Sequence, residues 1–549
     1  MTATNSSNFK DLRLRAAKMF AQSMVFVDDE ASQRVESQPV SPLERPEEGI
    51  NAKKVPDVQD EQDKGNNIEG YTFDAKSLID RSMELGLICS VLRPEKGEDF
   101  KGRVVTAASV ADIVCLDWEI YDDGGEAASQ IIASILQEDS KQNGRLRLIA
   151  IYTGDVTNKN IIMDQVYEAI PAEIKEKQEL NKEAFEIKSK SGVQIVCLFK
   201  KHGVRLEATV EAHQVSEAEL PQRLQSEFSK LSEGLLSNTA LATIASIRNS
   251  THHVLSKFAG QMDGPFFHHR ALIDNPEDAE EYAVNIILSE LKGAVDKQQI
   301  GTDHTGSQAI SSRIQELAEN LGDAETLKFH YGNRENPETY DLDVKHAIRM
   351  ASGGLHLLSD FKNELRNPPP RDSDFKNNFS SLFAGSLEKA RSHMHQFAAL
   401  TGVQTYPGSY LCQQGTWFPK LGLGSIVRED ENESYLLCLQ ASCDSVRIKG
   451  EKYFLFVSLE EEEADPDHVI PMQRDNTEGF DCIGLKISSE SYRATCTIRF
   501  TASQETKTVN AKNNAHEPDF YFEDTEGKKY LWVADLKRRR ALRTAQNLG

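Results

Sequence analysis

Five short, almost entirely apolar segments in the first 205 residues constrain the fold more than any other feature of the sequence. They are SMVFVDDE (23–30), LICSVL (87–92), ADIVCLD (111–117), RLRLIAIYTGD (145–155) and VQIVCLFKK (193–201). Helical patterns separate several of them, at 74–85, after Gly124 and Gly125 to about Gln137, and near 159–169. Continuous apolar strands that alternate with helices are typical of a parallel sheet covered on both faces. We therefore predict an α/β domain with a doubly wound, parallel, five-stranded sheet.

Polar side chains stand where these apolar segments end. The carboxyl ends of parallel strands are where functional groups collect in such sheets. The polar residues at these ends are Asp28, Asp29 and Glu30 after the first segment, Asp117 after the third, Thr153 after the fourth, and Lys200 with Lys201 after the fifth. A lone carboxylate is expensive to desolvate, so Asp117 needs partners at the end of its strand. The sequence predicts that these side chains share one edge of the sheet.

A carboxylate grouped with other carboxylates, a lysine and a hydroxyl is suited to accepting a phosphoryl group. Asp117 is the candidate acceptor, because a carboxylate can form a covalent intermediate with such a group. Both reactants are anionic, and Mg²⁺ can bridge them. The expected ligands of this ion are Asp28, Asp29, Asp117 and the backbone carbonyl of Glu119. Lys200 would neutralise one phosphoryl oxygen, and the Thr153 hydroxyl would donate a hydrogen bond to another.

Four stretches, taken in order, resemble the response-regulator receiver domain, which has a flavodoxin-like fold. They are VFVDDE (25–30), IVCLDW (113–118), IAIYTG (149–154) and VCLFKK (196–201), and the resemblance covers about residues 1–205. It implies that the acid pair Asp28 and Asp29 binds Mg²⁺ and that Asp117 takes phosphate from a histidine kinase. It also implies that Thr153 and Lys200 read the phosphorylated state.

The sequence also departs from the ordinary receiver pattern. A segment rich in proline and acidic residues, 31–70, reads as a disordered insertion beside the metal site. Lys201 stands where the family usually has proline, so the phosphate-contacting lysine is either Lys200 or Lys201. No aromatic residue occupies a clear switch position, because Phe199 lies one residue too close to the lysine.

These departures, together with a long C-terminal region, resemble the divergent receiver proteins of Detocs-type phage-defence systems. In such systems a sensor kinase feeds one receiver that is fused to an effector and another receiver that carries none. The resemblance implies that this chain is the second kind, a phosphate sink or relay that competes with an effector-bearing receiver. Two alternatives from the residues stay open. One is a pseudo-receiver that binds a partner without being phosphorylated, with the C-terminal β-domain doing the recognition, and the other is an enzyme in the C-terminal half.

The remainder of the chain changes character twice. Residues 206–400 have mostly helical periodicity, with weaker helices and loops over 297–375, and residues 401–549 are rich in strand patterns. We predict a helical middle region and a β-rich C-terminal domain of unknown role. The basic cluster LKRRRALR (536–543) could contact phosphate or RNA. We interpret it instead as offsetting the acidic body of the chain or as capping the C-terminal half of the last helix.

The bulk properties limit the classes of partner. The net charge of −23 argues against broad contact with nucleic acid or with an anionic membrane. The eight cysteines are scattered and none forms a CxxC pair, which fits a reduced compartment better than a disulfide framework. We expect a cytoplasmic protein that binds neither nucleic acid nor membrane, accepts phosphate and is not an enzyme.

Overall fold

The computed structural model describes most of the chain in two compact units, Met1–Glu316 and Leu317–Gly549. The described residues are 8–31, 73–95, 97–142, 144–156, 161–189, 192–201, 207–273, 276, 278–332, 337–366, 368–409, 412, 417–429, 434–463, 465–473, 480–488, 494–513 and 520–548. Apart from Ala31, the predicted disordered insertion (31–70) lies outside them. The limits of three domains at 1–205, 206–400 and 401–549 stay predictions.

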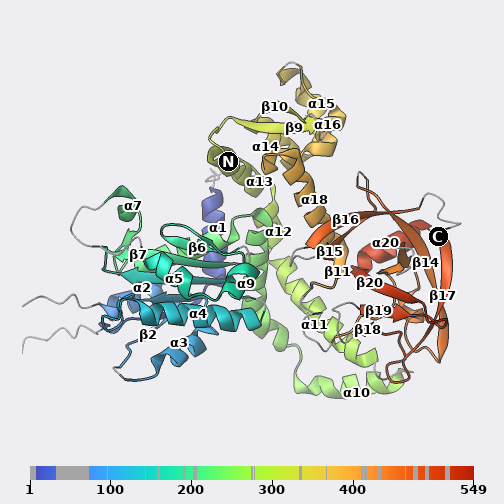
Figure 1. The fold of residues 1–549 in the computed structure, drawn as a ribbon, viewed down its shortest axis with the longest axis horizontal. Coiled ribbons are helices and arrows are strands. Elements are labelled where there is room, and N and C mark those ends of the chain that lie inside the picture. Colours follow the sequence, from blue (N-terminus) through green and yellow to red (C-terminus); the bar gives the residue numbers. More distant parts are fainter. Residues whose placement is uncertain are drawn as a thin grey trace, which may run out of the picture. The chain divides into compact units, whose positions relative to one another are not determined.

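The first unit is built on a mixed sheet (Figure 1). Its strands are β1 (Ser23–Val27), β2 (Ile88–Leu92), β3 (Ile113–Leu116), β4 (Arg147–Thr153), β5 (Asn181–Lys182), β6 (Glu186–Lys188), β7 (Val193–Lys200) and β8 (Gln214–Val215). The order is β2-β1-β3-β4-β7-β6-β5, with β8 beside β7. The five apolar segments form β1, β2, β3, β4 and β7, which pair in parallel.

Among the described residues this sheet has eight strands rather than the predicted five, and it is mixed rather than purely parallel. Strands β5 and β6 form an antiparallel pair, and β6 runs antiparallel to β7. The additional strands, β5, β6 and β8, span two, three and two residues. Such short pieces of a polar sequence carry no readable alternation of apolar and polar residues, so only tertiary contacts define them.

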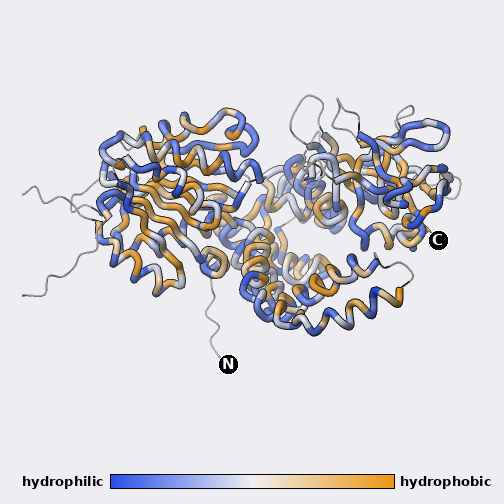
Figure 2. Tube along the Cα trace, turned by 90° about the horizontal axis from the view of Figure 1, so that it is seen from below, coloured by the Kyte–Doolittle hydropathy of each residue, from blue (hydrophilic) through white to orange (hydrophobic). Residues whose placement is uncertain are grey.

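Helices cover both faces of this sheet. Buried residues of α3 (Phe100–Ala108), α4 (Glu126–Lys141) and α5 (Ile162–Ala169) pack on one face. Buried residues of α1 (Phe9–Phe20), α2 (Ala75–Glu84), α8 (Leu220–Ser229) and α9 (Leu235–Leu255) pack on the other. Figure 2 shows the hydrophobic residues of this unit concentrated along its strands. The doubly wound arrangement fits the predicted α/β class, although helix α3 was not predicted.

Six further helices belong to this stretch of the chain. They are α6 (Ala172–Lys177), α7 (Ala208–Glu211), α10 (Asp263–Leu272), α11 (Asp278–Lys297), α12 (Ile300–Thr305) and α13 (Ser307–Asn320). No helix in the described parts of the chain is long and apolar enough to cross a membrane.

The second unit opens with an antiparallel hairpin and several helices. The hairpin joins β9 (Thr326–Gly332) to β10 (Pro337–Asp343). The helices are α14 (Val344–Gly353), α15 (Leu358–Phe361), α16 (Asp372–Asn378), α17 (Ser381–Ala384) and α18 (Leu387–Gly402). The hairpin lies where only weak helices and loops were predicted. In β10 only Leu342 is buried, and a strand with so few apolar residues gives no alternating signal.

The C-terminal part of this unit is a ten-stranded antiparallel sheet, which confirms the predicted β-rich region. Its strands are β11 (Val403–Thr405), β12 (Ser425–Glu429), β13 (Tyr435–Cys438), β14 (Glu451–Glu461), β15 (His468–Gln473), β16 (Phe480–Ile487), β17 (Thr495–Thr501), β18 (Lys512–Asn513), β19 (Phe520–Glu523) and β20 (Lys529–Leu536). Two clusters of buried hydrophobic residues include its strands, one cluster with Trp532 and the other with Val533. Neighbouring residues of a strand face opposite sides, so the sheet is buried on both faces. Helix α20 (Arg538–Leu548) follows the last strand.

Candidate functional site

The register between β1 and β3 brings three carboxylates together. Val27 lies opposite Leu116, and the backbone N–H of Asp117 donates to the Val27 carbonyl at 2.8 Å. The first residue after each strand is an aspartate, so Asp28 and Asp117 leave the sheet at the same level. One carboxylate oxygen from each of Asp28, Asp29 and Asp117 lies within 4.8 Å of the others. The predicted acidic edge is therefore present as a compact cluster.

Lys200, at the end of β7, extends its ammonium group into this cluster. Its Nζ lies 3.4 Å from Asp28 Oδ2 and 3.5 Å from Asp117 Oδ1. Two residues earlier in their strands, Phe26, Cys115 and Leu198 all pack in the core on one face of the sheet. Because side chains alternate along a strand, Asp28, Asp117 and Lys200 share that face. Lys201 is exposed to solvent, so Lys200 is the lysine beside the carboxylates.

Two aromatic rings lie beside the ammonium group of Lys200, and neither was predicted from the sequence. Nζ of Lys200 lies 5.9 Å from the ring centroid of Phe73 and 5.7 Å from that of Tyr152. The Phe73 ring also stacks on Phe26 at 4.6 Å, and the Tyr152 hydroxyl donates to the Val215 carbonyl at 3.1 Å. Rings in these positions restrict the lysine and stabilise its charge. Tyr152 immediately precedes Thr153 in β4, but no pattern in the sequence connects Phe73 with the strand ends.

Burial changes the acid–base properties of the cluster. Loss of solvent raises the pKa of Asp117 to about 7, although the Lys200 charge acts in the opposite direction. Burial likewise raises the pKa of Asp28 above its ordinary value. Burial lowers the pKa of Lys200, but the carboxylates of Asp117, Asp28 and Glu30 outweigh that effect and raise it overall. The site thus holds more buried acidic groups than its one ammonium group balances.

The carboxylate oxygens fit a divalent cation. Asp29 Oδ2 accepts a hydrogen bond from the backbone N–H of Tyr121 at 3.0 Å. Asp29 Oδ1 is buried and has no hydrogen-bond partner among the described residues. An orphaned buried oxygen is costly unless a ligand satisfies it. Carboxylate oxygens are the ligands that Mg²⁺ prefers, and the three in this cluster lie within 4.8 Å of one another. Neighbouring oxygens around an octahedral Mg²⁺ are about 3 Å apart, so the three carboxylates would move closer together as they bind the ion.

Glu119 follows β3 and Thr153 ends β4, and the side chain of each has a hydrogen-bond partner outside the three carboxylates. The Glu119 carboxylate, in the loop after β3, accepts from the backbone N–H of Gly124 at 3.1 Å, and the role of its carbonyl stays a prediction. Thr153 is buried at the end of β4, and its hydroxyl accepts from the backbone N–H of Asp155 at 3.0 Å. Among the described residues, Thr153 has no hydrogen bond to the three carboxylates. Its role in sensing phosphate also stays a prediction.

The loop between β3 and α4 is fixed by a close contact between Trp118 and Gly125. The Trp118 ring is buried, and Gly125 has φ +83°. A Cβ atom at Gly125 would lie 2.0 Å from the ring, which leaves room only for glycine. Because Trp118 follows Asp117 directly, this contact fixes the backbone that presents the candidate acceptor.

The comparison with protein families bears on the part of the chain that contains this cluster. Residues 20–205 match the family model of the response receiver domain. The match and the parallel sheet with helices on both faces support a receiver domain here. Receiver domains bind Mg²⁺ through acidic residues and generally interact with histidine kinases, and the buried aspartate cluster of this domain has the composition for such a metal site. No curated protein and no solved structure matches the chain.

Proposed function

We propose that the receiver domain accepts a phosphoryl group on Asp117 from a histidine kinase, with Mg²⁺ bound by Asp28, Asp29 and Asp117. One observation supports this proposal above all others. Asp28, Asp29, Asp117 and Lys200 lie together at strand ends within the region that matches the receiver family, residues 20–205. In this proposal the chain is a phosphoryl acceptor in a two-component pathway rather than an enzyme.

Each side chain has a distinct task in the transfer. A carboxylate oxygen of Asp117 attacks the phosphorus atom, and the bond from phosphorus to the kinase histidine nitrogen breaks. Bound Mg²⁺ would supply positive charge to the phosphoryl oxygens. Lys200 already lies 3.5 Å from Asp117 and would neutralise another oxygen as the group arrives. The Phe73 and Tyr152 rings hold the lysine near that position.

Labelling with a small phosphodonor tests this assignment. Full-length protein incubated with acetyl phosphate and Mg²⁺ should gain one phosphate that hydroxylamine removes, as expected of an acyl phosphate. Asp117→Asn should abolish the gain. Asp122→Asn is the matched control, because this exposed residue lies in the same loop and has φ +56°, which asparagine tolerates. Undiminished labelling of the Asp117 variant would reject the acceptor assignment.

We further propose that accepting phosphate is itself the task of this chain, as a sink or relay in phage-defence signalling. Two features of the sequence support this proposal. Its departures from the ordinary receiver pattern resemble those of receivers that carry no effector, and the usual switch position holds no aromatic residue. Phe199, the nearest candidate, is buried against Phe185, with ring centroids 5.8 Å apart, on the sheet face opposite Lys200. A sink would compete with an effector-bearing receiver for one kinase. A pseudo-receiver would instead bind its partner without gaining phosphate.

A further inference from the structure

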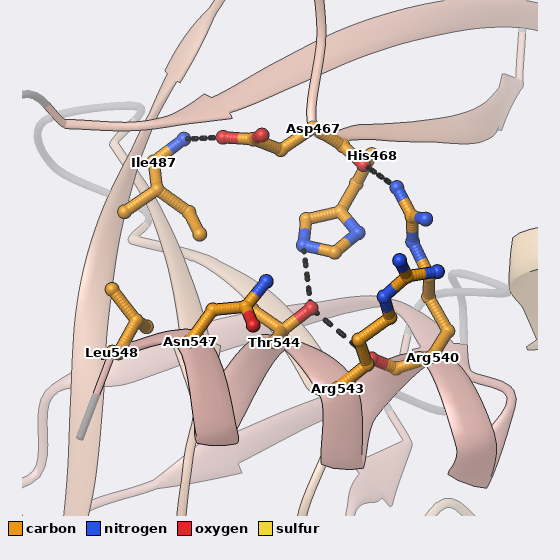
Figure 3. A pocket seen from close by; sticks show the side chains of 8 residues that line it. All are labelled: Asp467, His468, Ile487, Arg540, Arg543, Thr544, Asn547 and Leu548. Atoms are coloured by element: carbon orange, nitrogen blue, oxygen red, sulfur yellow. Dashed lines mark hydrogen bonds between the residues drawn. The ribbon is translucent and has the colours of Figure 1, made fainter.

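A pocket of about 360 Å³ in the second unit lies where β15 begins beside helix α20 (Figure 3). The polar residues that line it are Asp467, His468, Arg540, Arg543, Thr544 and Asn547. Four of them belong to α20; Arg543 and Thr544 lie three and four residues after Arg540, and Asn547 lies seven after it, so the four share one face of the helix. This face includes part of the basic cluster 536–543, for which the receiver site has no use.

Positive charge exceeds negative charge in this pocket. The Arg540 guanidinium donates to the backbone carbonyl of Asp467 rather than to a carboxylate. The Asp467 carboxylate accepts from the backbone N–H of Ile487 at 2.9 Å. Arg543 has neither an ion pair nor a hydrogen bond among the described residues. Two guanidinium groups thus face one carboxylate in a chain whose net charge is −23.

His468 adds a buried hydrogen-bond acceptor to the pocket. The Thr544 hydroxyl donates its hydrogen to the Arg540 carbonyl at 3.1 Å. We therefore assign the ring hydrogen of His468 to Nε2, which lies 3.5 Å from the Thr544 oxygen. Burial, with a smaller effect of Arg540, lowers the pKa of His468 to about 4, which keeps the ring neutral. Its Nδ1 therefore carries no hydrogen, and it is buried without a partner among the described residues. Figure 3 shows this nitrogen on the side of the ring toward Arg540 and Arg543.

We propose that this pocket binds the phosphate monoester of a small, hydroxyl-bearing molecule. A phosphate dianion matches the charge of Arg540 and Arg543, and guanidinium groups bind phosphate oxygens in pairs. A ligand hydroxyl would donate to Nδ1 of His468, which otherwise lacks a partner. The volume of about 360 Å³ is in the range of small-ligand pockets. This proposal rests on the second unit alone and is independent of the receiver function.

Calorimetric titration of the full-length protein with ribose 5-phosphate tests the proposal, with inorganic phosphate and ribose as comparison ligands. Ribose 5-phosphate should bind saturably and more tightly than inorganic phosphate, and neutral ribose should not bind. Arg543→Gln should weaken binding about tenfold or more. Arg539→Gln is the matched control, because Arg539 is an exposed residue of the same helix that does not line the pocket. This control should change binding by less than about twofold.

Three results would overturn the proposal. The first is the absence of saturable binding by both phosphate-containing ligands at millimolar concentration. The second is equal weakening in the Arg543→Gln and Arg539→Gln variants, since that would indicate attraction by the whole basic helix rather than by the pocket. The third is tighter binding of a single-stranded RNA than of ribose 5-phosphate, with both variants equally impaired, which would indicate a nucleic-acid surface.

Discussion

Asp117 is a buried acid next to other acids, and this position makes the stability of the metal-free protein depend on pH. Its pKa is about 7 when folded, above its ordinary value of 3.8. The folded protein therefore holds a proton that the unfolded chain releases at lower pH. The stabilisation from this proton is complete below about pH 4 and is lost as the pH rises through about 7.

The residue-scale prediction is that Asp117→Asn stabilises the metal-free protein at pH 8 but not at pH 4. A neutral amide avoids the desolvation of the carboxylate, so the gain should be on the order of a few kcal/mol at pH 8. Urea unfolding in a chelator, measured for both proteins at several pH values, checks this. A difference between the two proteins that does not change with pH would contradict the burial of a titrating Asp117.

Mg²⁺ affinity tests the other two carboxylates. Asp28→Ala and Asp29→Ala each remove a carboxylate from a site whose remaining ligands are mostly water, so each should weaken Mg²⁺ binding about tenfold or more. Fluorescence of the adjacent Trp118 can follow the titration. Glu138→Gln is the control, since Glu138 is an exposed residue of α4 outside the three-carboxylate cluster. Unchanged affinity in both aspartate variants, or an equal loss in Glu138→Gln, would place the metal elsewhere.

At the scale of the element, the β3–α4 loop depends on one glycine. Gly125→Ala would force an unfavourable positive φ and a collision with the Trp118 ring. We expect a loss of at least about 1 kcal/mol in stability and slower phosphorylation, because Trp118 adjoins the acceptor. Gly124→Ala is the control: Gly124 also has positive φ, but a Cβ there would meet no atom within 4 Å. Phosphorylation slowed equally in both variants would mean that the Trp118 contact does not position Asp117.

The elements that could be predicted from the sequence are those marked by a pattern of residues within one short segment. The apolar runs of β1, β3 and β4 are buried on both faces, so they appear as continuous hydrophobic segments. Asp28, Asp117 and Lys200 were predictable because strand ends in a parallel sheet share an edge. Phe73 could not be predicted, because it reaches Lys200 only through the tertiary fold. Helix α3 was missed too, because it buries only Phe100, Val104 and Ala108 and has a weak apolar stripe.

At the scale of the whole molecule, loss of the acceptor should have different consequences for a phosphate sink and for a receiver that passes the signal forward. Cells that carry the kinase, the effector-bearing receiver and Asp117→Ala in this chain should grow poorly without phage. The competing acceptor is then absent, and stray phosphate reaches the effector. The control is the Asp122→Asn variant, which should grow normally. Normal growth of the Asp117→Ala strain, combined with lost protection during infection, would reject the sink and favour a forward relay.

The most direct measurement of the central claim is the location of the phosphate on the chain. Phosphorylated protein is treated with borohydride, which reduces an aspartyl phosphate to homoserine, and the peptides are then read by mass spectrometry. We predict homoserine at position 117 only, and only when Mg²⁺ and the phosphodonor are both present. Homoserine at 28 or 29, or phosphate that survives the treatment on a serine, threonine or histidine, would contradict Asp117 as the acceptor.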